Sequence, residues 1–120
     1  MEAEVVKTFR FEAAHSLPNA PPGHKCRNLH GHGYRIDVHV TGAVDPRGGW
    51  VIDFGEITKV VAPILAELDH RLLNDVPGLA NSTAETIARY LFDRISPHLP
   101  GLSAVTAWES DTSRAVYRGG

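Results

Sequence analysis

Residues 25–41, KCRNLHGHGYRIDVHVT, pass from a polar loop into a regular alternation of apolar and polar residues. From Tyr34 to Val40 every second side chain is apolar, and this period of two predicts a β-strand with one buried face. The segment from Val5 to Ala13 has a similar alternation. We expect these two segments to pair antiparallel, so that the end of the first strand meets the start of the second.

The remaining segments have helix and strand patterns in turn. Apolar residues with a period of 3.6 follow Asp53 and Glu56, whose spacing is that of a capping box at a helix N-terminus. Ser82 and Glu85 have the same spacing ahead of a second apolar series. Further strands are expected at residues 50–53, 102–110 and 114–118. This order predicts an α+β fold in which two helices cover one face of an antiparallel sheet.

The composition is that of one ordinary domain, which we assign to residues 1–120, with 42% hydrophobic and 22% charged residues. The net charge of −2 gives no reason to expect a nucleic-acid partner. No segment approaches the ~20 consecutive apolar residues of a membrane span. The single cysteine cannot form an intramolecular disulfide, which fits a reducing compartment. We therefore expect a cytoplasmic protein without a nucleic-acid or membrane partner.

Three histidines share the apolar parity of the two pairing strands. His15 follows Ala13 by two residues, and His30 and His32 precede Tyr34 by four and by two. Antiparallel pairing would bring the three imidazoles together on one face at one end of the sheet. Catalytic zinc sites use three protein ligands and keep one position open. The pattern therefore favours a metal site, although a His-x-His spacing alone is also common without one.

Cys26 lies four residues before His30 and allows three interpretations. It can be the fourth ligand of a closed structural zinc site, a reactive thiol beside an open site, or an inert cysteine that packs as a small hydrophobe. The flanking Lys25 and Arg27 favour a reactive thiolate over a buried thiol. The spacing does not choose between a ligand and a reactive group.

Two further places carry ionisable groups. In the segment LDHRLLN, Asp69 is adjacent to His70 and can orient the imidazole as an acid or base, but a histidine at a helix C-terminus is an equally good explanation. Glu109 shares the parity of Val105 and Ala107, which predicts an inward carboxylate unless the strand end is exposed to water.

Several short motifs together resemble one known family. FEAAH, CRNLHGHGY, LDHRLLN, STAE, WES and YRG occur in the order seen in the 6-pyruvoyl-tetrahydropterin synthase superfamily, from about Phe9 to Arg118. The segments EAAHSLPNAPPGHKC, VDPRGGWVIDFGE and LNDVPGL are most similar to the bacterial 6-carboxy-5,6,7,8-tetrahydropterin synthase branch, which acts in queuosine biosynthesis. The resemblance implies the tunnelling fold, in which small ββααββ subunits assemble into an oligomeric barrel. A homohexamer with active sites between subunits is then expected.

The resemblance also implies a role for each candidate residue. His15, His30 and His32 match the zinc ligands, Cys26 matches the catalytic thiol, and Asp69 and His70 match its acid–base partners. Glu109 matches the carboxylate that anchors the pterin ring, with help from Thr83. The implied substrate is 7,8-dihydroneopterin triphosphate, converted to 6-carboxytetrahydropterin, acetaldehyde and triphosphate. The segment Asn81-Ser82-Thr83 departs from the N-P-T that is common in the family, and Gly33 stands where a larger residue is usual.

Overall fold

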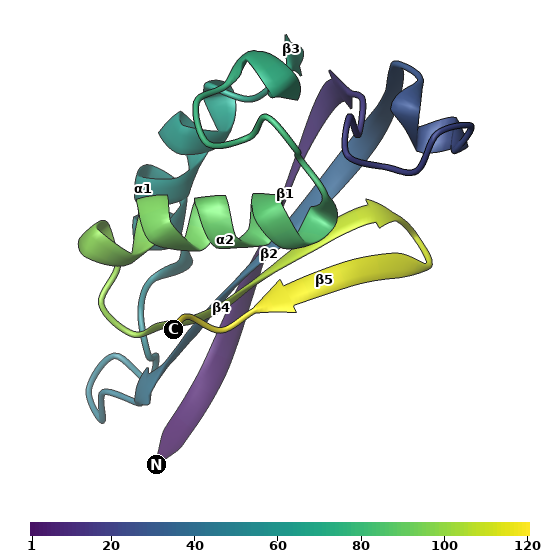
Figure 1. Ribbon diagram of the computed structural model, residues 1–120. Coiled ribbons are helices and arrows are strands. Elements are labelled where there is room, and N and C mark those ends of the chain that lie inside the picture. The colour runs from purple at the N-terminus through teal and green to yellow at the C-terminus, as the bar shows by residue number, and fades with distance from the viewer.

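Two long strands form the centre of the structure, a computed structural model that describes residues 1–120. Strands β1 (Glu2–His15) and β2 (His30–Ala43) pair antiparallel along their whole length. Exposed and buried side chains alternate along β1, as its sequence predicts. Figure 1 shows the two strands crossing the molecule, with the N-terminus at one end and the loop that joins the strands at the other.

Three shorter strands complete a five-stranded sheet of order β3-β1-β2-β4-β5. Strand β4 (Leu102–Ser110) pairs antiparallel with β2, and β5 (Ser113–Tyr117) pairs antiparallel with β4. Both were expected. Strand β3 (Arg71–Leu72) was not, because its two exposed residues have no alternation to detect, and it pairs parallel to β1.

The strand expected at residues 50–53 is wrong. Trp50 to Ile52 form bends, and Asp53 is the N-cap of the following helix. Val51 and Ile52 are apolar because they pack against the hydrophobic core. Apolar residues in a short segment of this kind can therefore come from packing against the core, without any pairing to a neighbouring strand.

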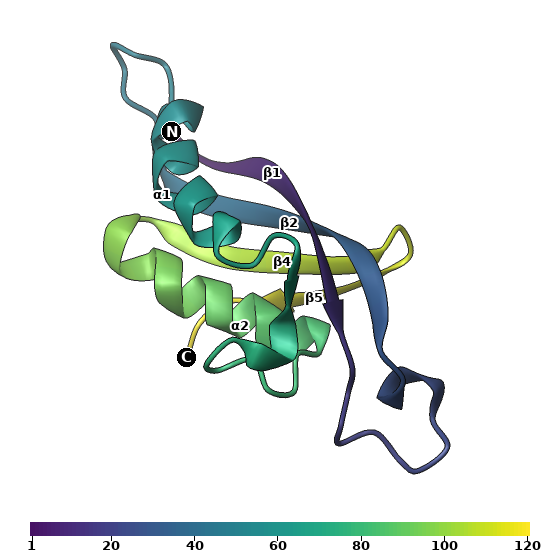
Figure 2. The ribbon, with the colours of Figure 1, turned by 90° about the horizontal axis from the view of Figure 1, so that it is seen from above.

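Two helices cover one face of the sheet, which confirms the α+β prediction (Figure 2). Helix α1 (Phe54–Ala66) begins after Asp53, whose Oδ1 accepts a hydrogen bond from the Gly55 N–H, and it lies against β1. Helix α2 (Ala84–Ile95) lies against β4 and β5. Short 3₁₀ turns lie at η1 (Lys25–Arg27), η2 (Leu73–Asp75) and η3 (Ser96–His98). Neither helix has the length and apolar character required to cross a membrane.

The predicted cap of the second helix is off by one residue. The N-cap is Thr83, whose Oγ1 accepts a hydrogen bond from the Thr86 N–H at 3.2 Å. Ser82 is instead fully buried. The displaced cap leaves the Ser82 hydroxyl available for another contact, described below.

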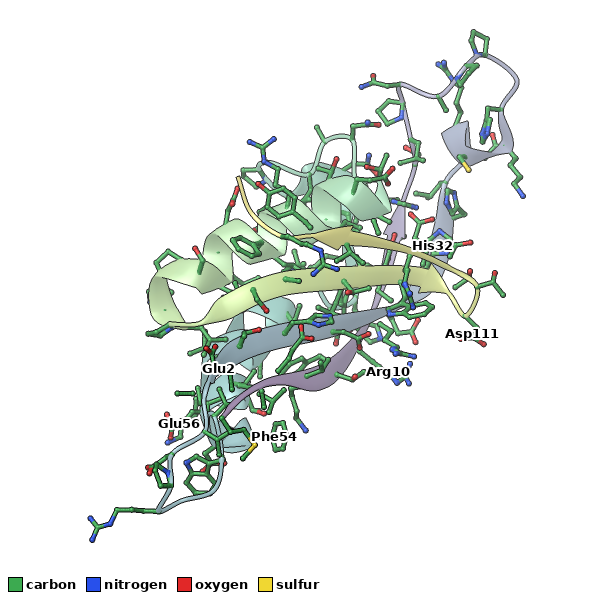
Figure 3. All side chains as sticks on the ribbon, turned by 90° about the horizontal axis from the view of Figure 1, so that it is seen from below. Glu2, Arg10, His32, Phe54, Glu56 and Asp111 are labelled. Atoms are coloured by element: carbon green, nitrogen blue, oxygen red, sulfur yellow. The ribbon has the colours of Figure 1, made fainter.

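The sheet has a covered face and an open face. On the covered face, Tyr34, Ile36 and Val38 of β2 are fully buried against the helices, together with Ile57 and Leu91. Burying each aliphatic side chain of this kind contributes roughly 1.5–3 kcal/mol, so the core fixes which side of each strand faces inward. The open face carries polar side chains such as Arg10 (Figure 3). The three predicted metal ligands have the parity of the covered face.

Candidate active site

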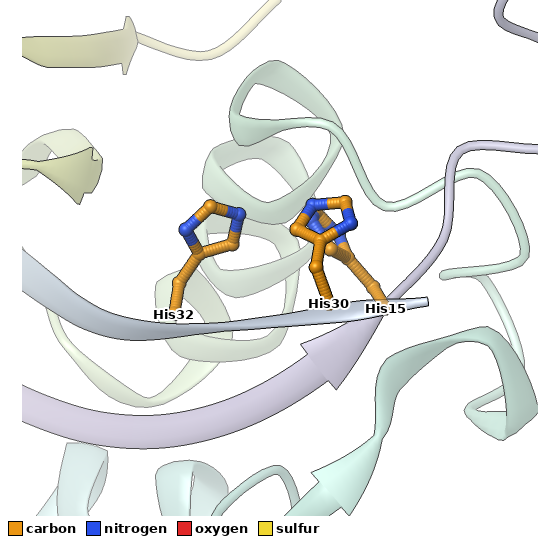
Figure 4. Close-up of side chains that lie close together, drawn as sticks. All are labelled: His15, His30 and His32. Carbon is orange, nitrogen blue, oxygen red and sulfur yellow. The ribbon is translucent and has the colours of Figure 1, made fainter. Parts of the chain in front are cut away.

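The antiparallel pairing brings three imidazoles together at one end of the sheet. His15 is directly opposite His30, and His32 is opposite Ala13. The ring centroids are 4.6 to 5.0 Å apart, and the candidate ligand atoms all lie within 4.8 Å of one another. Figure 4 shows the three rings on the same side of the two strands. The predicted convergence is confirmed, and we call His15, His30 and His32 the histidine cluster.

Each histidine has a distinct set of partners. The Nδ1 of His15 lies 2.9 Å from the Ser82 carbonyl oxygen, and the Nδ1 of His30 lies 2.7 Å from the Asn28 carbonyl oxygen. A carbonyl can only accept, so Nδ1 of each ring carries a proton, and in a neutral imidazole with this tautomer Nε2 has the lone pair. The Nε2 of His32 is buried without a partner. A metal ion would satisfy this nitrogen, and three neutral imidazoles are a donor set that suits zinc.

The surroundings of His15 keep its ring neutral. Burial lowers the pKa of His15 to about 4, an effect that the hydrogen bond to the Ser82 carbonyl opposes and that the nearby His30 and His32 strengthen. The hydroxyl of Tyr34 lies 3.2 Å from Nδ1 and 3.3 Å from Nε2 of the same ring. Burial, and secondly the carboxylate of Glu109, raise the pKa of Tyr34. His15 is therefore in the protonation state that a metal ligand requires.

The histidine cluster opens into a cavity of about 460 Å³, a size within the range of small-molecule sites. Cys26 and Glu109 line the same cavity, as does Lys25. Two of the predicted site residues, Cys26 and Glu109, therefore lie in the same cavity as the three histidines. Cys26 is a free, half-buried cysteine, and its sulfur is not part of the group of ligand atoms that the three histidines form.

Cys26 lies in the 3₁₀ turn η1, which is fixed at several points. The Cys26 N–H donates to Nδ1 of His24 at 3.0 Å, and the Leu17 N–H donates to the Cys26 carbonyl oxygen at 2.7 Å. The guanidinium of Arg27 donates to the Ala20 carbonyl oxygen. These contacts fix the conformation of the loop between β1 and β2, which contributes Leu17, Lys25 and Cys26 to the lining of the cavity.

Asp69 and His70 form the expected pair, with Nδ1 of His70 3.0 Å from Oδ2 of Asp69. The pair is attached to β1 at Glu12, whose N–H donates to Oδ1 of Asp69 and whose carbonyl oxygen accepts from the His70 N–H. The Glu12 N–H, followed by the His70 side chain, lowers the pKa of Asp69. His70 has φ of +58°, a left-handed conformation that is uncommon for a residue other than glycine. The side chain is thus held at the sheet edge.

The same pair lies away from Cys26 within the chain. His70 borders a second cavity, and the other residues that line it have both parities: Glu12, Ala13, Ala14, Gly31, His32 and Gly33. Cys26 and Glu109 border the cavity on the covered face. Within one chain, His70 and Cys26 therefore line different cavities, and His32 lines both of them.

Thr83 is engaged in the fold. Its Oγ1 caps α2 and lies 3.0 Å from the hydroxyl of Thr86. It does not line the cavity that contains the histidine cluster. Sequence reasoning missed the contact of Ser82 with His15, and the only signal for it was the capping-box spacing, which pointed to a different role.

Comparisons with known proteins agree with this geometry. The family model for 6-pyruvoyl tetrahydropterin synthase matches residues 4–120. The chain is 39% identical to the 6-carboxy-5,6,7,8-tetrahydropterin synthase of Synechocystis sp., over 94% of this chain and 91% of that protein. It is 35% identical to the dihydroneopterin monophosphate aldolase of Pyrococcus furiosus, over 92% and 93% of the two chains.

A solved structure has nearly the same fold. The 6-pyruvoyl tetrahydropterin synthase of Caenorhabditis elegans superposes with a TM-score of 0.91 at 29% identity, covering 100% of this chain and 97% of the other. The resemblance seen in the sequence motifs is thereby confirmed over almost the whole chain. The protein belongs to the 6-pyruvoyl tetrahydropterin synthase family and has the tunnelling fold.

Proposed function

We propose that this protein is a zinc-dependent carbon–carbon lyase of queuosine biosynthesis. It converts 7,8-dihydroneopterin triphosphate and one water into 6-carboxy-5,6,7,8-tetrahydropterin, acetaldehyde and triphosphate. The observation that carries the proposal is the single cavity that joins the three histidines, Cys26 and Glu109. The similarity to the Synechocystis protein of that name supports the choice of reaction.

The histidine cluster fits zinc. His15 and His30 direct their protonated nitrogens to backbone carbonyls, and the buried Nε2 of His32 lacks a partner. Zinc at this position supplies Lewis-acid chemistry, lowering the pKa of hydroxyl groups on the substrate side chain. Cys26 stands outside the group of ligand atoms, which favours a reactive thiol over a fourth ligand.

The residues around the cluster have complementary roles in this proposal. The thiolate of Cys26 removes or returns a proton beside the pterin ring, a contribution on the order of 10²–10⁴-fold for a positioned base. The carboxylate of Glu109 accepts hydrogen bonds from the pterin amino and ring N–H groups. Thr83 supports the site by capping α2, and its assignment as a substrate contact has no support from its position.

The position of Asp69 and His70 supports a site shared between subunits. Asp69 and His70 are attached to the β1 edge at Glu12, and neither lines the cavity that contains Cys26, so we infer that a second subunit supplies the acid–base pair to each thiol. Strand β5 is an edge strand, and β3 covers only Ala13 and Ala14 of β1. Open edges of this kind can pair with another chain. We infer a homohexamer in which His70 of one subunit acts at the cavity of another.

The test is a product analysis. The zinc-loaded protein is incubated with 7,8-dihydroneopterin triphosphate, acetaldehyde is trapped as a hydrazone, and the pterin is identified by mass. Equal amounts of acetaldehyde and 6-carboxytetrahydropterin support the proposal. Accumulation of 6-pyruvoyltetrahydropterin without aldehyde would identify the sister activity, which the likeness to the Caenorhabditis elegans synthase favours.

Two controls define the remaining alternatives. The monophosphate of dihydroneopterin is assayed in parallel, since the Pyrococcus furiosus relative is named for that compound. A non-catalytic zinc module with Cys26 as ligand is tested by cobalt substitution. A cysteine thiolate ligand gives an intense charge-transfer band, and three histidines with water do not.

A further inference from the structure

The segment from Asn74 to Ser82 contacts the end of β1 at two places. Ser82 is fully buried, and its carbonyl oxygen and its Oγ lie 2.9 Å and 3.1 Å from Nδ1 of His15. Since Thr83 caps α2, the Ser82 hydroxyl has no part in the helix start. The carbonyl oxygen and the hydroxyl of one buried residue therefore both lie close to one ring nitrogen.

The second contact holds the backbone next to His15. The Ser16 N–H donates to Oδ1 of Asn74 at 2.9 Å, and Nδ2 of Asn74 donates to the Ser16 carbonyl oxygen at 2.8 Å. The Asn74 side chain thus pairs with both backbone groups of Ser16, as a neighbouring strand would. Its Nδ2 also donates to the Ala80 carbonyl oxygen at 2.9 Å. Asn74 therefore connects the end of β1 to the segment that carries Ser82.

We infer that Asn74 and Ser82 are positioning residues for the metal ligand His15, an inference that rests on the proposed metal site. Asn74 fixes the backbone at the end of β1, and Ser82 fixes the ring. The carbonyl of Ser82 can only accept, so His15 is the Nδ1–H tautomer and presents the Nε2 lone pair to the metal. Rotation of the ring is restricted before the metal arrives, so binding does not have to order this ligand.

Ser82 contacts Nδ1 of His15 through two separate groups, its backbone carbonyl oxygen and its side-chain Oγ. A proline would keep the carbonyl contact and remove the Oγ. The hydroxyl is therefore expected to strengthen a contact that the backbone already makes, and Asn74 to act independently of it.

The experiment measures metal affinity in competition with a chromophoric chelator, for zinc and for cobalt. Changes around a ligand typically cost about 10- to 100-fold in affinity. We expect Ser82→Ala, which keeps the carbonyl, near the lower end of that range and Asn74→Ala within it. Ser103→Ala is the matched control, because it removes a half-buried serine hydroxyl that donates to the His39 carbonyl oxygen, away from the cluster. It should bind metal like the parent.

The melting temperature of each metal-free variant separates positioning from general destabilisation. Ser82→Ala and Ser103→Ala should lose similar stability, and only the former should lose affinity and shift the cobalt d–d bands. A Ser82→Ala protein that binds metal like the parent would overturn the inference. A parent that binds no metal at all would instead overturn the proposed function.

A measurement on the unaltered protein covers the case in which a variant does not fold. The ¹⁵N shifts and long-range ¹H–¹⁵N correlations of the metal-free parent show which nitrogen of His15 carries the proton. We expect the Nδ1–H tautomer at neutral pH. Finding the proton on Nε2 contradicts the inference without reference to metal or activity.

Discussion

The two faces of the same sheet each contain a buried polar cluster, and the two clusters differ in how completely they are satisfied. On the open face, Asp37 is only 6% exposed and accepts hydrogen bonds from Thr8, Arg35 and Trp108, at 2.8 to 3.2 Å. We call these four residues the Asp37 cluster. On the covered face, Nδ1 of His15 and Nδ1 of His30 each lie within hydrogen-bond distance of a backbone carbonyl oxygen, whereas Nε2 of His32 has no partner.

The difference indicates what each cluster is for. The carboxylate of Asp37 is satisfied by its own chain, as is usual for buried polar groups that stabilise a fold. In the histidine cluster, by contrast, the chain itself provides no hydrogen-bond partner for Nε2 of His32. Residues that violate the rules of burial without an internal compensation are expected at functional sites. Substitutions in the two clusters should therefore affect different properties.

The largest effect is expected for the three proposed metal ligands. His15→Ala, or the same change at His30 or His32, should reduce bound zinc well below one equivalent per subunit and abolish turnover. The loss of affinity should exceed the ~10- to 100-fold typical of changes outside the ligand set. Metal analysis after gel filtration measures the effect. His39→Ala is the control, because His39 bonds to Glu4 and Thr106 on the open face. Stoichiometric zinc in the His15 variant would remove His15 from the site.

Removal of the Cys26 thiol should lower turnover without changing the zinc content. Cys26→Ala is expected to lower kcat by about 10²–10⁴-fold, because a positioned proton carrier is removed while the three ligands remain. Zinc content and kcat are measured on the same preparation. A zinc-free Cys26→Ala protein would make Cys26 a ligand and favour the structural metal site.

The shared site can be tested by mixing inactive subunits. Cys26→Ala and His70→Ala proteins are each expected to be inactive, and mixed oligomers should regain activity. If each site takes Cys26 from one subunit and His70 from another, random mixing leaves both intact in about one site in four. A mixture of Cys26→Ala with Cys26→Ser subunits is the control and should stay inactive. No recovery in the first mixture would place both residues in the same subunit's site or outside catalysis.

Glu109 should affect binding of the pterin. Glu109→Gln replaces an acceptor oxygen with a donor and leaves a group of the ligand unpaired, at about 1–3 kcal/mol. This corresponds to roughly 5- to 150-fold weaker binding, measured by titration calorimetry with a non-reactive pterin. Zinc content should not change. Equal affinities of Glu109→Gln, the exposed control Glu56→Gln and the parent would exclude Glu109 as the anchor.

The histidine cluster could be predicted because two local rules were sufficient. The period of two fixes which face each residue of a strand occupies, and antiparallel pairing then fixes that His15 meets His30. Glu109 followed from the same parity. No loop conformation had to be predicted for the three histidines, because β1 ends at His15 and β2 begins at His30.

The features that were missed depend on tertiary contacts. The place of His70 is set by β3, whose two residues pair parallel to β1 and leave no sequence pattern. The choice of Thr83 over Ser82 as helix cap depends on Ser82 being buried against His15. Both residue types suit an N-cap, so local propensity could not distinguish them.

The smallest functional effect is expected in the Asp37 cluster, where a substitution should change stability alone. Asp37→Asn weakens the hydrogen bonds from Arg35 and Trp108 and should cost about 1–3 kcal/mol of unfolding free energy, with zinc content unchanged. Burial alone would raise the pKa of Asp37, but the hydrogen bonds from Arg35, Trp108 and Thr8 outweigh it and lower the pKa.

The sign of the pH dependence follows from this lowered pKa. Above the unfolded pKa of about 3.9, the carboxylate is ionised in both states and its stabilising contribution is complete. As the pH falls below that value, the unfolded state takes up a proton first, so the contribution declines and is lost as the pH passes through the folded pKa. Urea unfolding of metal-free parent and Asp37→Asn proteins should therefore give a constant difference in free energy from neutral pH to about pH 5, and a shrinking one below about pH 4. A difference that persists unchanged in acid would mean that the charge of Asp37 contributes nothing, and the contrast between the two faces would then rest on the histidine cluster alone.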